Sequence, residues 1–580
     1  MPTSHCCSCS CSFSITDGDT AFYRTMGVPA PLWCPTCRAR RRFSWRNERS
    51  LFKSRCARSN HDLISTFPPE SGIVVFDRDL WWQDDWDALS YGMSYDPAIS
   101  FFDQFGALLK HVPFPAVFSA RCQNTSYCNH VGEMKDCYLT SASWACDRVL
   151  YGNQMISLRD CTDGLGLGHC ELCYECVGCE GLYNCVYAID SEGCSDCAFL
   201  YDCLGCRSCF GCNNLRHASY CLFNRQCSKA EYAAELANLN LGSYAVLSQQ
   251  RAQLITRIQS ALHRASRQRQ CEESIGEHLI ECRNCEFCYN LSGRTRDCKY
   301  TMMGGMGLND AYDCYGVGES AELMYESIDS GANGMHYLAD LVVWTCTDVA
   351  YSINCHNCQN CFGCIGLRGK SHCIFNQQYS AEQYKALRAQ IVNHMQHSPY
   401  LDRRGRAHTY GDFFPSDLSP FAYNDTLAQD YLPLNEEDAL SEGFRWRSYT
   451  EKSAKITISA DTLPDQLANE LSALAHEVIG CAAYAEKRPR CTSAFRLCAA
   501  ELEFYQRMNL PLPRYCPNCR HERRFGFRRS PWLWQRECSC REGTHPHGPR
   551  ACTAPMWTSF APERKERVLC ERCYELLIMG

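Results

Sequence analysis

Residues 170–212 read CELCYECVGCEGLYNCVYAIDSEGCSDCAFLYDCLGCRSCFGC, and the positions of their cysteines decide the fold. Each of these cysteines lies a multiple of three residues from the next, and the same register holds for all eighteen cysteines between residues 122 and 227. If each gap met that register by chance one time in three, the odds of the whole run are on the order of one in a hundred million. The spacing therefore indicates a structural period.

A longer period, of twenty-four residues, lies over the shorter one. Two series show it: Cys122, Cys146, Cys170 and Cys194, and Cys137, Cys161, Cys185 and Cys209. Side chains repeat with a period of about 2 residues in a strand and about 3.6 in a helix, so neither explains this register as one long straight element. The pattern predicts a β-solenoid with about 24 residues per coil, in which stacked coils about 4.8 Å apart align the thiols in columns.

A diverged second copy of this segment follows at an offset of 152 residues. The stretch from Cys209 to Asn224 recurs from Cys361 to Asn376, although the register of three holds there only from Cys346 to Cys373. Each copy leads into a segment that begins with a serine typical of a helix N-cap. We expect helices over residues 228–268, broken near Gly242, and over residues 380–397.

The two ends of the chain form another related pair, at an offset of 482 residues. Cys34-Pro-Thr-Cys37-Arg38 matches Cys516-Pro-Asn-Cys519-Arg520, and Cys56 matches Cys538. An insertion of eleven residues follows in the C-terminal copy. These repeats predict a zinc-binding module (1–60), an aromatic-rich connector (61–120), a first solenoid (121–227), a helical connector (228–270), a second solenoid (271–378), a helix and loop-rich segment (379–480) and C-terminal zinc modules (481–580).

Paired cysteines at the N-terminus indicate a metal site. Cys6-x-x-Cys9 and Cys34-x-x-Cys37 supply four thiols in two pairs, which is the typical ligand pattern of a structural zinc ion. Cys7 and Cys11 are surplus thiols that could substitute for a member of this set.

The N-terminal residues also resemble a known family. Cys6, Cys9, Phe13, Asp19, Phe22-Tyr23, Gly27, Pro31 and Cys34-Pro-x-Cys37-Arg38 look like the bacterial "probable zinc-ribbon" family, over roughly the first 45 residues. The resemblance implies that the four cysteines bind zinc, and a diverged copy stands at the C-terminus. The wider arrangement is similar to Cys-rich bacterial proteins that carry this ribbon, for which no activity is established.

The C-terminal copy leaves its ligands less completely defined. Cys491, Cys516 and Cys519 match the pattern, whereas Arg488 occupies the position of the remaining cysteine, so Cys481 or Cys498 is the candidate fourth ligand. A third site is suggested by Cys540, Cys552, Cys570 and Cys573, with His545 and His547 as competing ligands. Its counterpart is absent at the N-terminus, where Asp77 and Leu80 replace the last pair. We therefore expect two to three structural zinc ions.

The solenoid thiols allow two interpretations. Neutral cysteine is a small hydrophobic residue that is often buried, so the columns could fill a narrow core. Alternatively, rows such as Cys203, Cys206, Cys209 and Cys212 could bind soft ions such as zinc or copper(I). Loss of many of these cysteines in the second copy favours packing.

Arginines interleaved with aromatic residues follow each of the two matching zinc motifs. Arginine pairs with phosphate and aromatic rings stack on bases, so these are candidate nucleic-acid contacts, with a solvated arginine face as the alternative. The candidate residues are Arg38, Arg40, Arg41, Arg42, Arg46, Arg523 and Arg524.

Composition and missing motifs narrow the function. The 58 Lys and Arg residues against 65 Asp and Glu give a net charge of −7, so any nucleic-acid contact must be local. No signal segment or membrane span is legible, and clustered cysteines fit a reducing cytoplasm. No P-loop, G-x-S-x-G or H-E-x-x-H motif occurs, and the acidic Trp81–Asp87 tract is more typical of a pinned loop than of an acid–base pair.

The sequence thus predicts a mainly β fold, with two tandem Cys-ladder β-solenoids flanked by zinc-ribbon or treble-clef modules and joined by helices. The function that fits is a zinc-stabilised, non-enzymatic scaffold that binds nucleic acid or a protein partner, without membrane association. A thiol-rich zinc or copper store or redox protein is one alternative. An enzyme that uses a solenoid groove is another, although no coherent catalytic set supports it.

Overall fold

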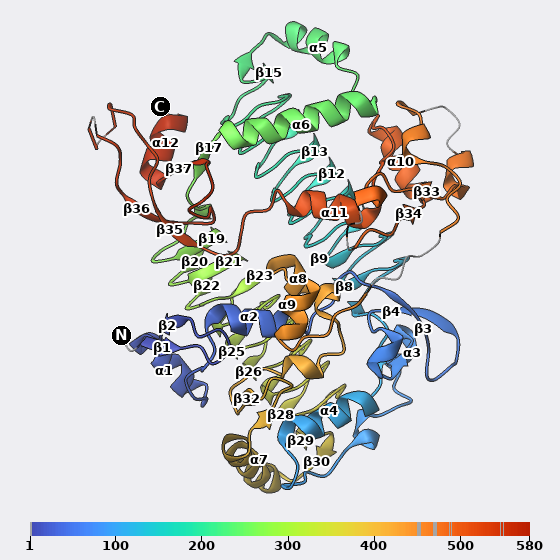
Figure 1. The fold of residues 1–580 in the computed structure, drawn as a ribbon, viewed down its shortest axis with the longest axis vertical. Helices are drawn as coiled ribbons and strands as arrows, with labels where there is room; N and C mark the ends of the chain where they lie inside the picture. The colour runs from blue at the N-terminus through green and yellow to red at the C-terminus, as the bar shows by residue number, and fades with distance from the viewer. Residues whose placement is uncertain are drawn as a thin grey trace.

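The protein is described by a computed structural model that covers residues 3–448, 454–467, 472–486, 488, 490–545, 547–548 and 550–579. Short strands and helices dominate this part of the chain, and most strands belong to two parallel ladders (Figure 1). Two end modules pack against the ladders, and helices and loops join the parts. The structure is strand-rich, but with 28% strand and 24% helix the predicted mainly β character is borne out only in part.

The first ladder advances by one turn between paired cysteines. Along it, Cys173 pairs in parallel with Cys185, and Cys185 with Cys197, so one turn takes twelve residues. The predicted coil length is therefore wrong, since the observed turn is half as long. The strands are β7 (Ser119–Ala120), β8 (Asn129–Gly132), β9 (Ser141–Trp144), β10 (Asp147–Leu150), β11 (Arg159–Thr162), β12 (Glu171–Tyr174), β13 (Tyr183–Val186), β14 (Ser195–Ala198) and β15 (Cys221–Leu222).

Alternation within one column accounts for one of the two series that indicated the longer period. Equivalent residues of successive turns stack in one column, and one buried column contains Met134, Cys146, Leu158, Cys170, Leu182 and Cys194. In this column cysteine thus recurs on every second turn, whereas the column that contains Cys173, Cys185 and Cys197 has cysteine on successive turns. Leucine and methionine fill the intervening turns, because either apolar type fits the interior.

The register of three comes from the corners of each turn. From Arg121 to Phe223 every third residue has a positive φ, such as 53° at Asp136 and 51° at Asp160. Such a left-handed residue reverses the chain sharply, so four triplets close one turn. The residue after each corner points inward, and this is where the ladder cysteines stand.

The second ladder has the same build with less regular turns. Asn309 pairs with Glu322 and Glu322 with Met335, thirteen positions on in each case, whereas Met335 pairs with Thr347, twelve positions on. The longer turns break the register of three before Cys346. The strands are β18 (Gln268–Arg269), β19 (Ile275–Ile280), β20 (Cys282–Arg283), β21 (Glu286–Ser292), β22 (Thr295–Arg296), β23 (Met302–Gly305), β24 (Asn309–Tyr312), β25 (Glu322–Tyr325), β26 (Met335–Leu338), β27 (Thr347–Ala350), β28 (Gln359–Phe362) and β29 (Ser371–Ile374).

Both ladders end in an antiparallel strand and a capped helix. The closing strands are β16 (Arg225–Gln226) and β30 (Gln377–Gln378). Ser228 caps α5 (Lys229–Asn238) and Ser380 caps α7 (Ala381–His397), each through a capping box, as the serine signals predict. The helix expected to reach residue 268 ends earlier, since α6 (Tyr244–Ser260) gives way to β17 (Leu262–Arg264).

The two end modules contain the same elements, and those from the second to the third strand recur at the offset that the sequence match predicts. The N-terminal module has β1 (Thr3–His5), β2 (Ser12–Ser14), α1 (Asp17–Thr25), α2 (Pro35–Phe43), β3 (Phe52–Arg55) and β4 (Asp62–Ser65). The C-terminal module has β33 (Ile479–Gly480), β34 (Ala494–Phe495), α10 (Ala499–Arg507), α11 (Pro517–Phe525), β35 (Trp534–Glu537) and β36 (Pro555–Thr558). It continues into β37 (Arg567–Leu569) and α12 (Glu571–Met579).

Short elements fill the two remaining segments. Between the N-terminal module and the first ladder lie β5 (Val75–Phe76), α3 (Arg78–Trp81), α4 (Phe101–His111) and β6 (Phe114–Pro115). After the second ladder come β31 (Tyr400–Leu401), β32 (Ala407–His408), α8 (Leu427–Tyr431) and α9 (Glu436–Ser441).

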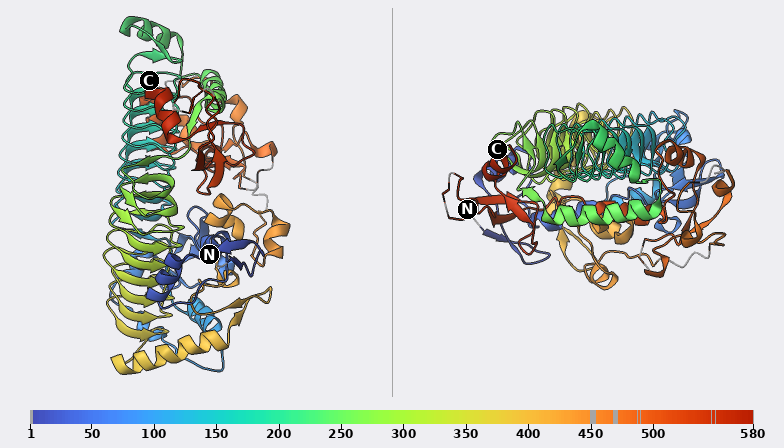
Figure 2. Two further views of the ribbon diagram at one scale, coloured as in Figure 1. Left: turned by 90° about the vertical axis from the view of Figure 1, so that its left-hand side faces the viewer. Right: turned by 90° about the horizontal axis from the view of Figure 1, so that it is seen from above.

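The ladders lie side by side and run in opposite directions. Gln154 Nε2 donates to the Tyr315 hydroxyl at 2.9 Å, and Arg267 lies 2.6 Å from Asp190. Later turns of the first ladder thus contact earlier turns of the second. In Figure 2 the ladder turns stack along one side of the molecule, with the end modules on the other.

Candidate metal centres

Three groups of four cysteines have the arrangement of a closed metal site. Within each group, all four sulfur atoms lie within 4.8 Å of one another. The groups are Cys6, Cys9, Cys34 and Cys37; Cys481, Cys491, Cys516 and Cys519; and Cys538, Cys552, Cys570 and Cys573. We call them the N-terminal, middle and C-terminal tetrads.

The sulfur spacing fits a tetrahedral ion. Cys9 Sγ lies 3.7 Å from Cys34 Sγ, and Cys491 Sγ lies 4.0 Å from Cys516 Sγ. An ion with metal–sulfur bonds of about 2.3 Å holds its ligands about 3.8 Å apart. Four-sulfur sites of this geometry are typical of structural zinc.

One backbone hydrogen bond recurs in all three tetrads. The N–H of Cys34 donates to Cys6 Sγ at 3.2 Å, that of Cys516 to Cys481 Sγ at 3.2 Å, and that of Cys570 to Cys538 Sγ at 3.2 Å. Such a bond stabilises a thiolate and orients it as a ligand.

The second cysteine pair of the N-terminal and middle tetrads begins a helix. Cys34 is the N-cap of α2 and Cys516 that of α11, and a proline follows each at the first helical position. Hydrogen bonds from neighbouring thiols, chiefly Cys37, lower the pKa of Cys34 to about 5. The helix N-terminus also favours negative charge, so this position suits a thiolate ligand.

The middle tetrad resolves the choice of its fourth ligand. Cys481 joins Cys491, Cys516 and Cys519, whereas Cys498 is the N-cap of α10 and lies outside the group. Cys481 lies ten residues before Cys491, so a C-x-x-C pattern could not reveal it.

The C-terminal tetrad differs from the predicted grouping in one member. Cys552, Cys570 and Cys573 are grouped as expected, but the fourth member is Cys538 and not Cys540. Cys538 directly follows β35, where its Sγ accepts the Cys570 N–H, while Cys540 points to His545, with Sγ 3.3 Å from Nδ1. The match of Cys538 to Cys56 was the available sequence signal.

The N-terminal counterpart of this tetrad keeps only its first element. Cys56 Sγ accepts the N–H of Asp77 at 3.2 Å, as Cys538 does from Cys570. Asp77 and Leu80 replace Cys570 and Cys573, so the thiol set is incomplete, as the sequence predicts.

Ladder cysteines do not form comparable groups. Within the part of the chain that the structure describes, none of them belongs to a set of three or more candidate ligands. Instead their thiols donate to backbone carbonyls, as Cys137 does to Lys135 O at 3.1 Å. This arrangement is that of a packed interior.

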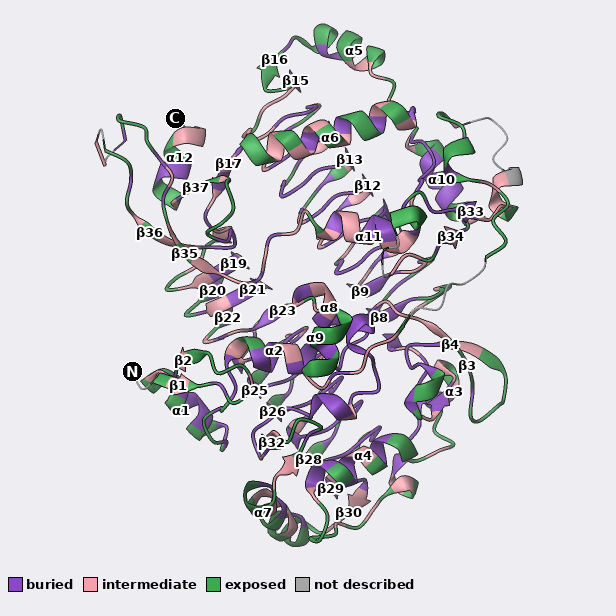
Figure 3. Cartoon of the chain, in the orientation of Figure 1, coloured by how far each residue is buried: buried purple, intermediate pink, exposed green. Residues whose placement is uncertain are grey.

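The arginines after the C-x-x-C pairs at Cys34 and Cys516 point into the ladders. On α2, Arg38 lies 2.8 Å from Asp313 and Arg41 lies 2.9 Å from Glu326, with all four side chains at most 3% exposed. Arg42 also contacts both of these carboxylates. Figure 3 shows the buried residues along α2.

The C-terminal module repeats the arrangement on the other ladder. Arg520 of α11 lies 2.7 Å from Asp163, and Arg524 lies 2.6 Å from Asp163 and 3.3 Å from Glu175. Asp163 and Glu175 are left-handed corner residues of successive turns, like Asp313 and Glu326 of the second ladder. Each module thus inserts an arginine helix between two corners, and we call these contacts the arginine clamps.

The clamps overturn the expected nucleic-acid surface at most of its residues. Arg38, Arg41, Arg42, Arg46 and Arg524 are 1–3% exposed, so they are not open to a phosphate backbone. Arg40 and Arg523 remain partly exposed. The alternative, a solvated arginine face, fails at the same residues, because most of them form buried ion pairs with carboxylates on distant ladder turns.

The acidic tract is explained by packing contacts. Trp81 is fully buried and donates to Pro113 O at 2.9 Å, while Asp87 lies 2.8 Å from Lys370, so the tract is held in place.

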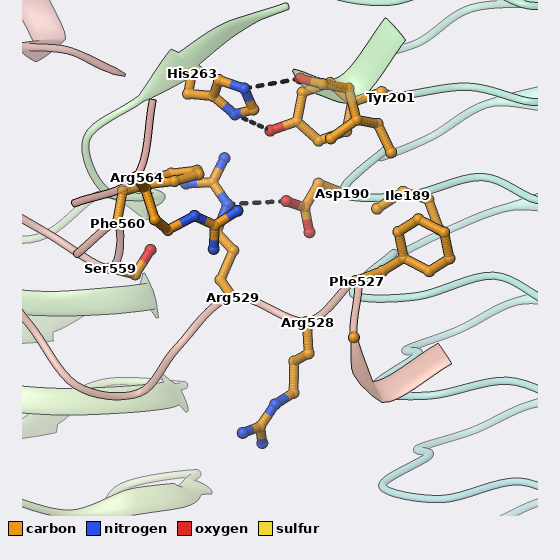
Figure 4. Close-up of a pocket in the computed structure, with 12 residues that line it drawn as sticks. Ile189, Asp190, Tyr201, His263, Phe527, Arg528, Arg529, Ser559, Phe560 and Arg564 are labelled. Carbon is orange, nitrogen blue, oxygen red and sulfur yellow. Dashed lines mark hydrogen bonds and ion pairs between the residues drawn. The ribbon is translucent and has the colours of Figure 1, made fainter. Parts of the chain in front are cut away.

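A separate pocket between the first ladder and the C-terminal module contains Arg529, whose Nε donates to Asp190 at 2.8 Å (Figure 4). Its volume of about 60 Å³ is far below the roughly 300 Å³ of small-molecule sites.

Comparisons with known proteins add no family. No protein-family model matches the chain, and no curated protein matches it in sequence. Among the described helices, none combines the length and apolar character needed to cross a membrane.

Proposed function

We propose that this protein is a zinc-stabilised, non-enzymatic scaffold in which metal-bound end modules clamp two β-solenoids together. The observation that supports it best is the direct continuity of tetrad, helix and clamp. Cys37 lies one residue before Arg38, and Cys519 lies one residue before Arg520. A metal ion that fixes the start of α2 or α11 therefore fixes the arginines that enter the ladder.

The parallel register supports the solenoid interpretation. Residues twelve or thirteen apart pair repeatedly along each ladder, and inward side chains stack in columns. Zinc is the expected ion, because four thiolates in a closed tetrahedral set are its usual structural ligands. A reducing cytoplasm is the expected compartment, since the ligands must stay thiolates.

A protein partner fits the electrostatics better than nucleic acid does. The clamps occupy the arginines that would contact phosphates, and the chain carries a net charge of −7. The outer faces of the ladders, built from stacked short strands, offer a long surface for binding.

Metal analysis of purified variants tests the scaffold. Cys34→Ser and Cys516→Ser should each remove one zinc ion per chain, because an incomplete tetrahedral site loses affinity sharply. Cys176→Ala in the ladder should remove none. Zinc or copper lost in proportion to mutated ladder cysteines would instead support a metal store.

Binding assays test the partner. A protein captured by the wild type, then purified and shown to bind directly, should lose affinity for the Cys34→Ser/Cys516→Ser variant if the clamped ladders form its site. Tight, salt-dependent binding of DNA or RNA by the wild type would instead favour nucleic acid as the partner.

A further inference from the structure

A second set of ligands lies beside the C-terminal tetrad and shares one cysteine with it. The candidate ligand atoms of Cys540, His545, His547 and Cys573 all lie within 4.8 Å of one another. Cys573 is also a member of the tetrad with Cys538, Cys552 and Cys570. A thiolate has lone pairs enough to bind two ions at once.

The two histidines are oriented as ligands. His547 Nδ1 lies 2.8 Å from the carbonyl oxygen of Arg550, which fixes the proton on that nitrogen. Its Nε2 is buried and lacks a hydrogen-bond partner within the described residues. Cys540 Sγ lies 3.3 Å from His545 Nδ1, close to the separation of about 3.5 Å between sulfur and nitrogen ligands of one zinc ion.

The extra ligands stand in an insertion. The hairpin loop between β3 and β4 spans residues 56–61, whereas the equivalent loop between β35 and β36 spans residues 538–554. The longer loop brings Cys540, His545 and His547 to the tetrad. The N-terminal module has neither the insertion nor a complete counterpart of the C-terminal tetrad, so the two features occur together.

We propose that the C-terminal module holds a two-ion centre, with zinc the expected metal, in which the Cys573 thiolate bridges both ions. One ion takes Cys538, Cys552, Cys570 and Cys573, and the other takes Cys540, His545, His547 and Cys573. With metal–sulfur bonds of about 2.3 Å on each side, the bridge keeps the ions within about 4.6 Å. The second ion also neutralises charge, because five thiolates around a single divalent ion would repel one another strongly.

Metal counting on the full-length protein tests the centre. Wild type loaded with zinc under reducing conditions should hold four ions per chain, one for each ligand group. His545→Ala/His547→Ala should hold three. His169→Ala, at an exposed ladder corner, is the matched control and should keep four. Three ions in the wild type, unchanged in the histidine variant, would overturn the proposal.

Cadmium-113 NMR provides a readout that does not depend on stoichiometry. A shared thiolate should couple two cadmium signals, one with four sulfur ligands and one with two sulfur and two nitrogen ligands. The histidine variant should retain an uncoupled four-sulfur signal, which shows that the module still folds. Wild-type signals that are all uncoupled would contradict the bridge. If the wild type gave no signals from the N-terminal and middle tetrads, that result would contradict the scaffold proposal and leave the two-ion centre unaffected.

Discussion

At the scale of single residues, the ladder cysteines form hydrogen bonds with buried backbone groups as well as filling the interior. The N–H of an inward residue points at the side chain one turn earlier. Ala188 N–H donates to Cys176 Sγ at 3.4 Å, and the Cys176 thiol in turn donates to Tyr174 O at 3.5 Å. Serine does the same at Ser191, whose hydroxyl accepts the Cys203 N–H at 3.2 Å. The inward position therefore favours small side chains that both accept and donate.

Substitution of Cys176 should separate this role from packing. In Cys176→Ala the buried Ala188 N–H loses its acceptor, and we expect a cost of about 1–3 kcal/mol in unfolding free energy. Cys176→Ser keeps an acceptor and should cost less. Urea unfolding and hydrogen exchange at the Ala188 amide measure both effects. Equal losses in the two variants would indicate that only the apolar volume matters.

A buried carboxyl group in the second ladder should make stability depend on pH. Asp340 stands at an inward position, fully buried, where its Oδ1 accepts the Ser352 N–H at 2.8 Å. Burial raises its pKa well above the usual value. The folded state therefore retains a proton that the unfolded state releases, so stability is full below pH about 4 and falls as the pH rises towards the folded pKa.

Asp340→Asn tests this linkage because it keeps the acceptor oxygen and removes the charge. We expect the variant to be more stable than the wild type near neutral pH and the difference to shrink as the pH falls to about 4. Thermal unfolding across that range measures it. A constant difference at every pH would show that Asp340 does not titrate as argued.

At the scale of elements, the clamp helices are stabilised by their surroundings more than by their own sequence. Three successive arginines in α2 would repel one another in an isolated helix, yet Arg41 and Arg42 both form close ion pairs with Glu326, at 2.9 and 2.7 Å. Tyr23 against Tyr325 and Tyr505 against Tyr174 add equivalent aromatic contacts, with ring centroids 5.4 and 5.8 Å apart. The ladder corners thus select the position of each helix.

Removal of one clamp arginine should be costly. Arg524→Ala leaves the buried Asp163 with one guanidinium where it had two and takes away the Glu175 contact, so we expect a loss of about 3 kcal/mol. Arg55→Ala is the control, since Arg55 and Asp62 are 66% and 84% exposed and such pairs contribute at most about 1 kcal/mol. Similar unfolding midpoints for the two variants would refute the clamp as a stabilising contact.

How far the sequence predicts this molecule depends on the range of each signal. The triplet register, the serine caps and the C-x-x-C pairs are local, so they predicted the ladders, α5 and α7, and most tetrad ligands. The turn length was missed because leucine and methionine alternate with cysteine in one column, although Cys173, Cys185 and Cys197 of another column recur at twelve residues. The Asp163 and Asp313 partners could not be predicted, because nothing local links an arginine to a carboxylate on a distant turn.

At the scale of the whole molecule, the arginine clamp of each end module lies on the ladder that is more distant along the chain. The N-terminal module contacts Asp313 and Glu326 of the second ladder, and the C-terminal module contacts Asp163 and Glu175 of the first. Each half of the duplicated chain thus places its arginine clamp on the ladder of the other half, and the two ladders run in opposite directions. Such long-range contacts close large loops and couple the ends of the chain to its centre.

This arrangement predicts which part of the chain should become less protected when each metal ion is lost. Cys34→Ser should release α2 and raise hydrogen exchange around residues 313–326, whereas Cys516→Ser should release α11 and raise it around residues 163–175. Cys498→Ser, outside the tetrads, is the control and should change neither region. Mass-spectrometric hydrogen exchange, with zinc content measured on the same samples, reads out both effects. If each variant instead loosened only its own module, the metal sites would stabilise the modules without clamping the ladders.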